Sequence, residues 1–387
     1  MKRVVFINQM GVQARLDDPV YAIGTDAFMS FGLAQFIIRE FQARGYALSC
    51  ESWRSDHRLH KTDSRDVDGV TCRVFPSLRL PKPLYEFSIS MLKVLLREAK
   101  EKSTIFHFMG THSLGYHIYA LFLRKRRVFA THLGDPDPLW RYRNGGGMRH
   151  LLFYLAEKHL FLRSYTCFFG ICILEHEYYT NLGFTSRQRA VLGVSRLDKF
   201  IIKSREECRV RLGLPLDKKI ILQVGRAVRY RGFKWMIETM DELRERSDLL
   251  FVFLNIKDNQ MYYQDLMSRD CLVKGYVSIE ELVDYYNAAD LHWFFYSETK
   301  QYLFGGTAYV PVEALVCGTP TLTNSFHHIA GSGIEEVARV PKDKTEIVPM
   351  LDDLLQNPPE RELCREKALG IFSWDIVLKN YWNDYNA

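Results

Sequence analysis

A single carboxylate, Glu313, lies in a short run of small and apolar residues that ends at Gly318 and Pro320. Glycine is the usual residue just past a helix end, and proline cannot continue a helix. We therefore expect a helix of about two turns with Glu313 in its first turn. The free N–H groups of a helix start attract anions, so this end could hold a ligand that carries hydroxyls and phosphates. The alternative is that Glu313 only complements the helix dipole.

Two arginines flank a second candidate site. The apolar run at 218–224 predicts a buried strand that leads into Gly225 and Arg226, and Arg231 follows before a helix expected at 235–243. A strand, a glycine turn and a helix in this order build phosphate sites at the carboxyl ends of strands. Arginine keeps its charge and binds phosphate through two hydrogen bonds. Neither the dinucleotide-binding glycine motif nor a P-loop is present, and a pair of solvated arginines is the alternative.

The order of the following elements makes this combination more specific. Ser278 with Glu281 predicts a helix start through a capping box. Further strands are expected at 249–254 and 291–296, with the segment 272–277 between them. From Gly193 to Tyr381 the chain resembles the retaining glycosyltransferases of family 4, in its Gly-Arg turn, its Gly-x-Val loop and its Glu-Ala run before Gly-x-Pro. This resemblance implies an α/β protein of the GT-B class, in which two doubly wound Rossmann-like domains face each other across a cleft.

The resemblance also implies roles for the two candidate sites. Arg226 and Arg231 match the residues that hold the diphosphate of a nucleotide sugar, with Gly225 at the turn, although Arg231 replaces a lysine of the family. Glu313 matches the carboxylate that binds the ribose hydroxyls. The residues that match the loop whose backbone meets the nucleotide base are Gly275 and Val277.

One position departs from the family pattern. The family has a first glutamate eight positions before the one matched by Glu313, and this chain has Gly305 there. Either Glu298 reaches the donor sugar from a longer loop, or backbone N–H groups of Gly305, Gly306 and Thr307 replace the carboxylate. We favour the backbone because Gly305 holds the aligned position.

The N-terminal half also alternates strands with helices, which predicts a parallel doubly wound sheet with functional groups at its carboxyl edge. Strands are expected at 3–8, 46–49, 70–75, 104–108 and 128–131, and helices at 32–44, 85–100 and 116–123. His132 follows the last strand and resembles the family's cleft histidine, which would hydrogen-bond the sugar and help to position the leaving group. The alternative for His132 is a capping or buried, satisfied histidine, and that is our interpretation of His107 and His112.

We expect no metal ion. Asp135 and Asp137 match the Asp-x-Asp metal motif of the other glycosyltransferase fold, but Asp66 and Asp68 do so as well, so chance supplies the pattern. The GT-B class uses arginines and helix ends where the other fold uses a divalent cation. No cofactor is expected beyond the nucleotide-sugar substrate.

The domain boundary is expected within 190–200, a stretch that resembles the family's linker between domains. This boundary gives an N-terminal, acceptor-side domain at 1–195 and a donor-binding domain at 196–373. The final helix at 374–387 is expected to pack back on the first domain. A chain of 387 residues is long enough for two domains that each have a core.

The composition fits a globular protein, at 47% hydrophobic and 25% charged residues. No stretch resembles a signal peptide or a membrane span, and eight cysteines without a Cys-x-x-Cys pair predict reduced thiols in the cytoplasm. The net charge of +6 is concentrated at 124–127 and at 141–149, beside apolar residues of 153–162. Such clusters can dock on anionic lipid or receive an anionic acceptor, and a solvated face is the alternative. Nucleic acid is not expected as a partner, because no aromatic platform interleaves the basic residues.

These observations predict a retaining hexosyltransferase-type enzyme that moves a sugar from a UDP- or GDP-linked donor to an acceptor hydroxyl in glycan biosynthesis. The acceptor could be a glycan, a lipid-linked sugar or a small molecule, and the enzyme is expected in the cytoplasm or peripherally at the membrane face. Two other functions stay open. One is a GT-B sugar phosphorylase or epimerase, and the other is a non-catalytic nucleotide-binding module, which the glycine at position 305 suggests.

Overall fold

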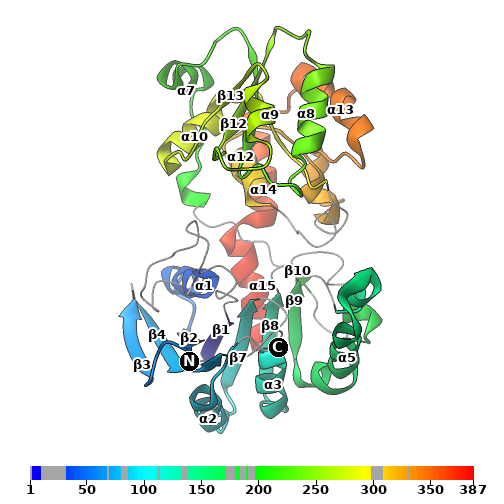
Figure 1. Cartoon of the computed structure of the whole chain (residues 1–387). Helices are drawn as coiled ribbons and strands as arrows, with labels where there is room; N and C mark the ends of the chain where they lie inside the picture. Colours follow the sequence, from blue (N-terminus) through cyan, green and yellow to red (C-terminus); the bar gives the residue numbers. More distant parts are fainter. Residues whose placement is uncertain are drawn as a thin grey trace. The chain divides into compact units, whose positions relative to one another are not determined.

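The computed structural model describes residues 2–9, 32–67, 69–79, 86–110, 114–132, 138–170, 179–183, 189–190, 197–297, 308–329 and 331–387. The chain divides into two compact units, Met1–Val191 together with Leu378–Ala387, and Leu192–Val377 (Figure 1). Each unit contains a mainly parallel β-sheet flanked by helices, so the predicted α/β class with two Rossmann-like domains is confirmed.

In the described part of the N-terminal unit, eight strands form one sheet in the order β10-β9-β8-β7-β1-β2-β4-β3. Every pairing is parallel except that between β3 and β4, where Gly69 turns the chain with φ of 79°. The strands are β1 (Lys2–Gln9), β2 (Leu48–Asp56), β3 (Asp63–Val67), β4 (Val70–Pro76), β7 (Thr104–Gly110), β8 (Arg127–His132), β9 (Cys167–Gly170) and β10 (Arg189–Ala190). Short strands β5 (Leu78–Arg79) and β6 (Glu86–Phe87) pair separately. The helical segments are α1 (Gly32–Ala43), α2 (Ile89–Glu98), α3 (Leu114–Phe122), α4 (Pro138–Arg141), η2 (Tyr142–Gly146), α5 (Met148–Ala156), η3 (Glu157–Phe161) and η4 (Leu162–Ser164).

The end of the chain completes the core of this unit. From Leu378 onward, helix α15 (Trp374–Asn386) belongs to the N-terminal unit, and it places Tyr381 and Tyr385 against the sheet. His107 on β7 is fully buried, and its Nδ1 pairs with the Tyr385 hydroxyl while its Nε2 lies 2.7 Å from Thr131 Oγ1. Burial lowers the pKa of His107 to about 3, so the ring is neutral. The interpretation of His107 as a buried, satisfied histidine is confirmed.

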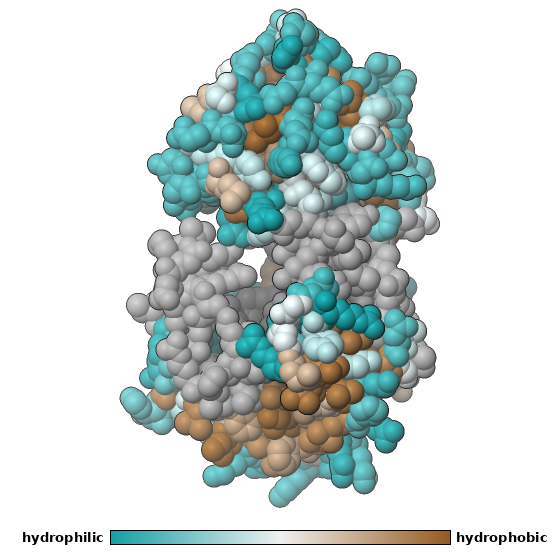
Figure 2. All heavy atoms as spheres, turned by 45° about the vertical axis from the view of Figure 1, so that its right-hand side comes forward, coloured by the Kyte–Doolittle hydropathy of each residue, from teal (hydrophilic) through white to brown (hydrophobic). Residues whose placement is uncertain are grey.

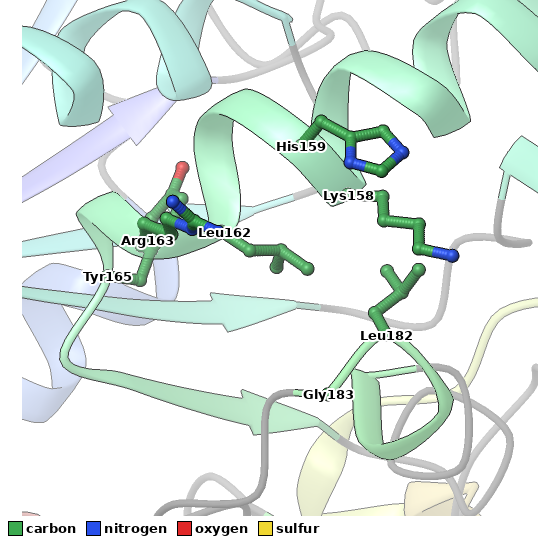
Figure 3. Close-up of a pocket in the computed structure, with 7 residues that line it drawn as sticks. All are labelled: Lys158, His159, Leu162, Arg163, Tyr165, Leu182 and Gly183. Atoms are coloured by element: carbon green, nitrogen blue, oxygen red, sulfur yellow. The ribbon is translucent and has the colours of Figure 1, made fainter.

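Helix α5 contrasts with this core, because all of its residues are described and none is buried. Figure 2 shows hydrophobic side chains gathered on the surface of the N-terminal unit on the side that carries this helix. Beside the following turns, η3 and η4, a cavity of about 370 Å³ is lined by Lys158, His159, Leu162, Arg163, Tyr165, Leu182 and Gly183 (Figure 3).

In the described part of the second unit, six strands form a parallel sheet in the order β13-β12-β11-β14-β15-β16. The strands are β11 (Lys219–Val224), β12 (Leu249–Leu254), β13 (Cys271–Val273), β14 (Leu291–Phe294), β15 (Thr321–Thr323) and β16 (Ala338–Arg339). Counted along the chain, this is the order 3-2-1-4-5-6 of a doubly wound sheet, whose switch point lies between β11 and β14. The helical segments are η5 (Leu197–Lys199), α7 (Arg205–Leu212), α8 (Phe233–Glu242), α9 (Tyr263–Met267), α10 (Ile279–Ala288), α12 (Tyr309–Val316), η6 (Asn324–Ile329), η7 (Ile334–Glu336), η8 (Lys344–Glu346), α13 (Ile347–Gln356) and α14 (Arg361–Phe372).

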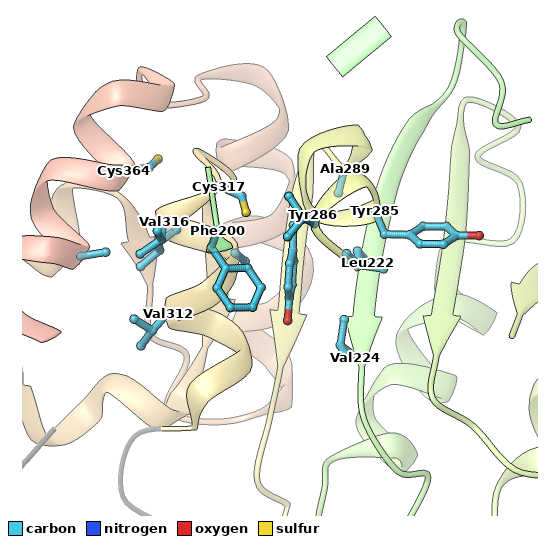
Figure 4. Close-up of a cluster of buried hydrophobic side chains, with 14 of the residues drawn as sticks. Phe200, Leu222, Val224, Tyr285, Tyr286, Ala289, Val312, Val316, Cys317 and Cys364 are labelled. Carbon is cyan, nitrogen blue, oxygen red and sulfur yellow. The ribbon is translucent and has the colours of Figure 1, made fainter. Parts of the chain in front are cut away.

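The strands of this sheet are apolar on both faces because helices cover both. Along β11, Leu222 and Val224 belong to one buried cluster, which Figure 4 shows, and Ile221 belongs to another. Within the described residues, no helix combines the length and the apolar character that crossing a membrane requires.

Three expected elements have different bounds. The strand expected at 46–49 continues as β2 to Asp56, because its polar side chains find buried partners, as in the 2.8 Å bond from Asn8 to Ser52. The helix expected from residue 85 begins at Ile89, where Ser88 caps it by accepting from the Met91 N–H. The strand expected at 291–296 ends at Phe294.

Candidate functional site

The glycine turn lies at the switch point of the second sheet. Gly225 follows β11 directly, has φ of +118°, and donates its N–H to Leu254 O at 3.0 Å. A Cβ at position 225 would lie 3.0 Å from Nη1 of Arg231. Both the backbone conformation and the close approach of the guanidinium therefore favour glycine here.

Arg231 lies over an aromatic ring. Its guanidinium carbon lies 5.2 Å from the centre of the Phe294 ring, which is a cation–π arrangement. Its Nε is buried and has no hydrogen-bond partner, and among the described residues no carboxylate pairs with it. Burial raises the pKa of the neighbouring Tyr296 to about 12, although the Arg231 charge acts in the opposite direction. Arg231 therefore keeps a positive charge that the described protein does not neutralise with an acid.

Arg226 lies half-buried in the same turn, with Nη2 3.4 Å from the Tyr230 hydroxyl. The turn is fixed to its neighbours by hydrogen bonds. Ala227 N–H donates to Gln260 Oε1 at 2.6 Å, on the loop after β12, and Ser297 N–H donates to Tyr230 O at 3.2 Å, on the loop after β14. The two arginines are thus presented by a loop with little freedom to move.

Gly232 ends this turn and begins helix α8. It has φ of +63°, and a Cβ there would lie 2.5 Å from the Cβ of Phe295, so a larger residue would push the helix away from the end of β14. No side chain caps the start of α8. Free N–H groups therefore lie beside Arg226 and Arg231, in the arrangement that binds phosphate in other α/β sheets.

The predicted nucleotide-base loop is tied to the same edge of the sheet through Asn255. This residue follows β12 with φ of +62°, donates its N–H to Gly275 O at 3.0 Å, and accepts the Val277 N–H on Oδ1 at 3.3 Å. Gly275 and Tyr276 are exposed, and Val277 is buried. Sequence analysis missed Asn255, although asparagine is among the residues that adopt the left-handed conformation most readily.

The expected place of Glu313 in the helix was wrong. Helix α12 begins at Tyr309, so Glu313 is its fifth residue and lies in the second turn. The helix can begin before Pro311 because the first N–H groups of a helix need no partner within it. The expected helix of two turns and its end at Cys317 and Gly318 are confirmed.

Glu313 is held inside the unit by a tyrosine. The Tyr286 hydroxyl donates to Glu313 Oε2 at 2.9 Å, and in the described part of the chain no cation pairs with this carboxylate. Burial raises the pKa of Glu313 to about 7, while the bond from Tyr286 acts to lower it. Figure 4 shows the Tyr286 hydroxyl directed toward the end of the sheet at which the strand arrows point. Sequence analysis did not identify Tyr286 as a site residue.

The structure therefore brings Gly225, Arg226 and Arg231 together in one turn. Leu254 and Asn255 link this turn to Gly275 by backbone hydrogen bonds and to Val277 through the Asn255 side chain. His132 is the last residue of β8 in the other unit, and its side chain is not among those described. The predicted residues that lie outside the described ranges are Glu298, Gly305, Gly306 and Thr307.

Within the described ranges, no group of three or more His, Cys, Asp and Glu residues could hold a metal ion. Of the two Asp-x-Asp sequences, Asp66 accepts the Gly69 N–H at 2.8 Å in the β3–β4 turn, whereas Asp135 and Asp137 lie outside the described residues.

Comparison with known proteins agrees with this geometry. Residues 204–369 match the family model of glycosyl transferases group 1. An uncharacterised glycosyltransferase of Methanocaldococcus jannaschii is 25% identical over 186 residues, which cover 45% of this chain and 46% of that protein. The chain spans less than half the length of the curated relatives that it matches.

Solved structures match over the whole length. Sucrose-phosphate synthase of Thermosynechococcus elongatus superposes with a TM-score of 0.63 at 15% identity, covering 100% of this chain and 98% of that one. HepE of Anabaena, in complex with UDP and glucose, gives a TM-score of 0.62 at 10% identity over 100% of both chains. At these identities the likeness shows the fold, which is GT-B. The family match and the fold together support a glycosyltransferase.

Proposed function

We propose that this protein is a retaining glycosyltransferase that moves a sugar from a nucleotide-diphosphate donor to an acceptor hydroxyl. The observation that carries the proposal is the turn from Gly225 to Gly232. It presents two arginines and an uncapped helix start at the switch point of a doubly wound sheet. Ligands bind in such sheets at this point, and this set of groups suits a diphosphate.

In this proposal the donor diphosphate lies against Arg226, Arg231 and the start of α8. These groups carry positive charge that is in place before the reaction, so they stabilise the charge that develops on the leaving phosphate. The Phe294 ring and the 3.0 Å fit against Gly225 hold the Arg231 guanidinium in position without neutralising it. The arginines and the helix start supply the positive charge that a divalent cation supplies elsewhere, so no metal or further cofactor is required.

The nucleoside extends along the same edge of the sheet. Gly275 and Val277 meet the base, and Glu313 accepts hydrogen bonds from the ribose hydroxyls, since Tyr286 engages only one of its two carboxylate oxygens. The presence of UDP in the HepE structure favours a uridine diphosphate donor.

Retention is what the resemblance to the family 4 enzymes implies, and the predicted site residues include no obvious nucleophile or base for inversion. The acceptor hydroxyl attacks from the face that the phosphate leaves, and the departing phosphate takes its proton. His132 hydrogen-bonds the donor sugar. The acceptor is a glycan, a lipid-linked sugar or a small molecule.

A panel of nucleoside diphosphates and nucleotide sugars tests the proposal. A ligand that binds only the folded state raises the melting temperature, so thermal shift identifies the base, and NMR of the product then reports the anomeric configuration. Transfer with retention supports the proposal. Inversion would contradict the retaining mechanism. Phosphate-dependent cleavage would indicate a phosphorylase instead, and binding without turnover would indicate a non-catalytic module. Arg231→Ala should lose the thermal shift, and Arg244→Ala, at an exposed arginine of the same unit, should keep it.

A further inference from the structure

The segment from Met148 to Ser164 exposes apolar side chains at helical spacing. Met148, Leu152 and Leu155 are spaced by four and three residues, so they form one stripe along α5, and their exposed fractions are 60%, 62% and 40%. Leu160 in η3 is 50% exposed. A surface helix normally buries its apolar stripe, and a continuous exposed apolar area marks an interaction site. Figure 2 shows such an area on this side of the N-terminal unit.

Among the described residues of 138–164, the exposed charged side chains have one sign. Glu157 is the one acidic residue in the sequence between 138 and 164. It is fully buried, and its Oε1 lies 3.2 Å from Nε2 of His117. The exposed charged residues of α5 and the turns after it are Arg149, Lys158 and Arg163. Within the described residues none of these three forms an ion pair, whereas most arginines of the second unit are paired. The surface therefore combines an apolar stripe with an unneutralised positive rim.

The cavity beside η3 and η4 extends this rim. Figure 3 shows Lys158 and His159 above Leu162 and Leu182, and Arg163 also lines the cavity, whose volume is about 370 Å³. Cations above an apolar floor suit a phosphate group that is attached to an apolar chain. The cavity lies on the same helical segment as the stripe, so one ligand surface could engage both.

We propose that the α5–η4 face docks on an anionic phospholipid surface, with the apolar stripe in the acyl boundary and the cavity around a headgroup phosphate. Stable binding to a membrane surface needs two attractive contributions, and this face offers an apolar stripe and a set of basic side chains. A protein partner would have to offer an extended acidic surface without basic residues. A second copy of the chain would bring like charges together, which disfavours a symmetric dimer through this face.

Vesicle sedimentation tests the docking without any donor sugar, so its result is independent of the proposed transferase activity. The vesicles are phosphatidylcholine alone and an equimolar mixture of phosphatidylcholine and phosphatidylglycerol. The protein should sediment with the mixture only, and added salt should release it. Leu152→Asp and the double variant Arg149→Glu with Lys158→Glu should each lower the partition coefficient by about tenfold or more. Leu152 is exposed, so its variant should fold, and its melting temperature checks this.

Matched controls lie in the second unit. Met267, at 53% exposure, and Arg244, whose side chain is 78% exposed, are replaced as Met267→Asp and Arg244→Glu, and neither change should alter sedimentation. Equal binding to neutral vesicles, or equal losses in the control variants, would overturn the proposal. A concentration-dependent dimer that Leu152→Asp abolishes would identify a second copy as the occupant instead. Displacement from vesicles by low concentrations of glycerol phosphate would identify a soluble phosphorylated ligand.

Discussion

An arginine lies near the amino ends of strands β11 and β14, and another lies near their carboxyl ends, and the two differ in their hydrogen-bond partners. At the amino ends, Arg209 donates to Asp290 at 2.6 Å and to three backbone carbonyls, and it is 5% exposed. Asp290 also accepts the Ile220 N–H at 2.7 Å, so both the guanidinium and the carboxylate of this ion pair have partners within the fold. At the carboxyl ends, Arg231 lies over Phe294 and no carboxylate among the described residues pairs with it. The comparison separates an arginine that stabilises the sheet from one that is available to an external anion.

The largest effect should come from the amino ends. Arg209→Ala removes the nearer of two arginines that pair with Asp290 and leaves Arg205 at 3.1 Å, so the free energy of unfolding should fall by about 3 kcal/mol, the low end for a broken buried ion pair. Urea denaturation measures this loss. Arg231→Ala is the matched variant and should lower stability by less than about 1 kcal/mol, because it breaks no ion pair within the protein. Equal losses in the two variants would remove the distinction between the two ends.

For ligand binding, replacing Arg231 should have a larger effect than replacing Arg209. Arg231→Ala should weaken binding of UDP or GDP by about 1.5–3 kcal/mol, the contribution of a hydrogen bond to a charged group. Arg231→Lys should recover part of this loss, since lysine keeps the charge without the two-pronged geometry. Calorimetry measures both affinities, with Arg244→Ala as the control that should bind like the unmodified protein. Unchanged affinity in Arg231→Ala would show that this arginine is not a diphosphate ligand.

Two glycines allow strain to be separated from contact. Gly225 and Gly213 both have positive φ, but a Cβ at 225 would meet Arg231, whereas a Cβ at 213 would have no atom within 4 Å. Alanine at either position should cost about 1–2 kcal/mol of stability through backbone strain. Only Gly225→Ala should also weaken diphosphate binding, because it displaces the guanidinium. If Gly213→Ala weakened binding as much, strain alone would explain the effect.

A pH dependence is also expected at Glu313. Burial raises the pKa of Glu313 from 4.5 to about 7, so between these values the folded chain keeps a proton that the unfolded chain releases. The stability contributed by this group is therefore complete below pH 4.5 and is lost as the pH rises toward 7. Urea denaturation across this range should show a slope that Glu313→Gln removes.

Nucleoside affinity should change in the opposite direction. The ionised carboxylate accepts hydrogen bonds from ribose hydroxyls, so affinity should rise through neutral pH by an amount on the order of 1 kcal/mol. The ligand's terminal phosphate titrates nearby, at about pH 6, so the readout is the difference between the unmodified protein and Glu313→Gln. Parallel affinity profiles of the two proteins would exclude Glu313 as the ribose ligand.

Local signals in the sequence predicted the central strands of both sheets, whereas β3, β9, β10, β15 and β16 were not predicted. The apolar runs at 219–224 and 249–254 are strands, and Ser278 accepts the Glu281 N–H at 3.1 Å as its capping pattern indicated. These features depend on neighbours in the chain, so the sequence displays them directly. The turn at Gly225 belongs to the same class, because a positive φ and a following helix leave a recognisable residue pattern.

Contacts between distant segments could not be predicted in this way. The bond from Tyr286 to Glu313 joins two helices, and its consequence for the pKa of Glu313 depends on burial that no local pattern encodes. Asn255 holds the loop at Gly275 only because β12 and β13 are neighbours in the sheet. The exposure of Leu152 was likewise hidden, since its helical spacing equally fits a helix that packs in a core.

The contacts of His107 show that the N-terminal unit needs the last residues of the chain to complete its core. Tyr381 and Tyr385 are fully buried in the N-terminal unit, and the ring of His107 depends on the Tyr385 hydroxyl for one of its two hydrogen bonds. Residues 378–387 emerge from the ribosome after all of 192–377. The N-terminal unit is therefore synthesised first but acquires its full core last. Until then its sheet exposes the apolar surface that α15 later covers, and the nascent chain needs protection from aggregation during this interval.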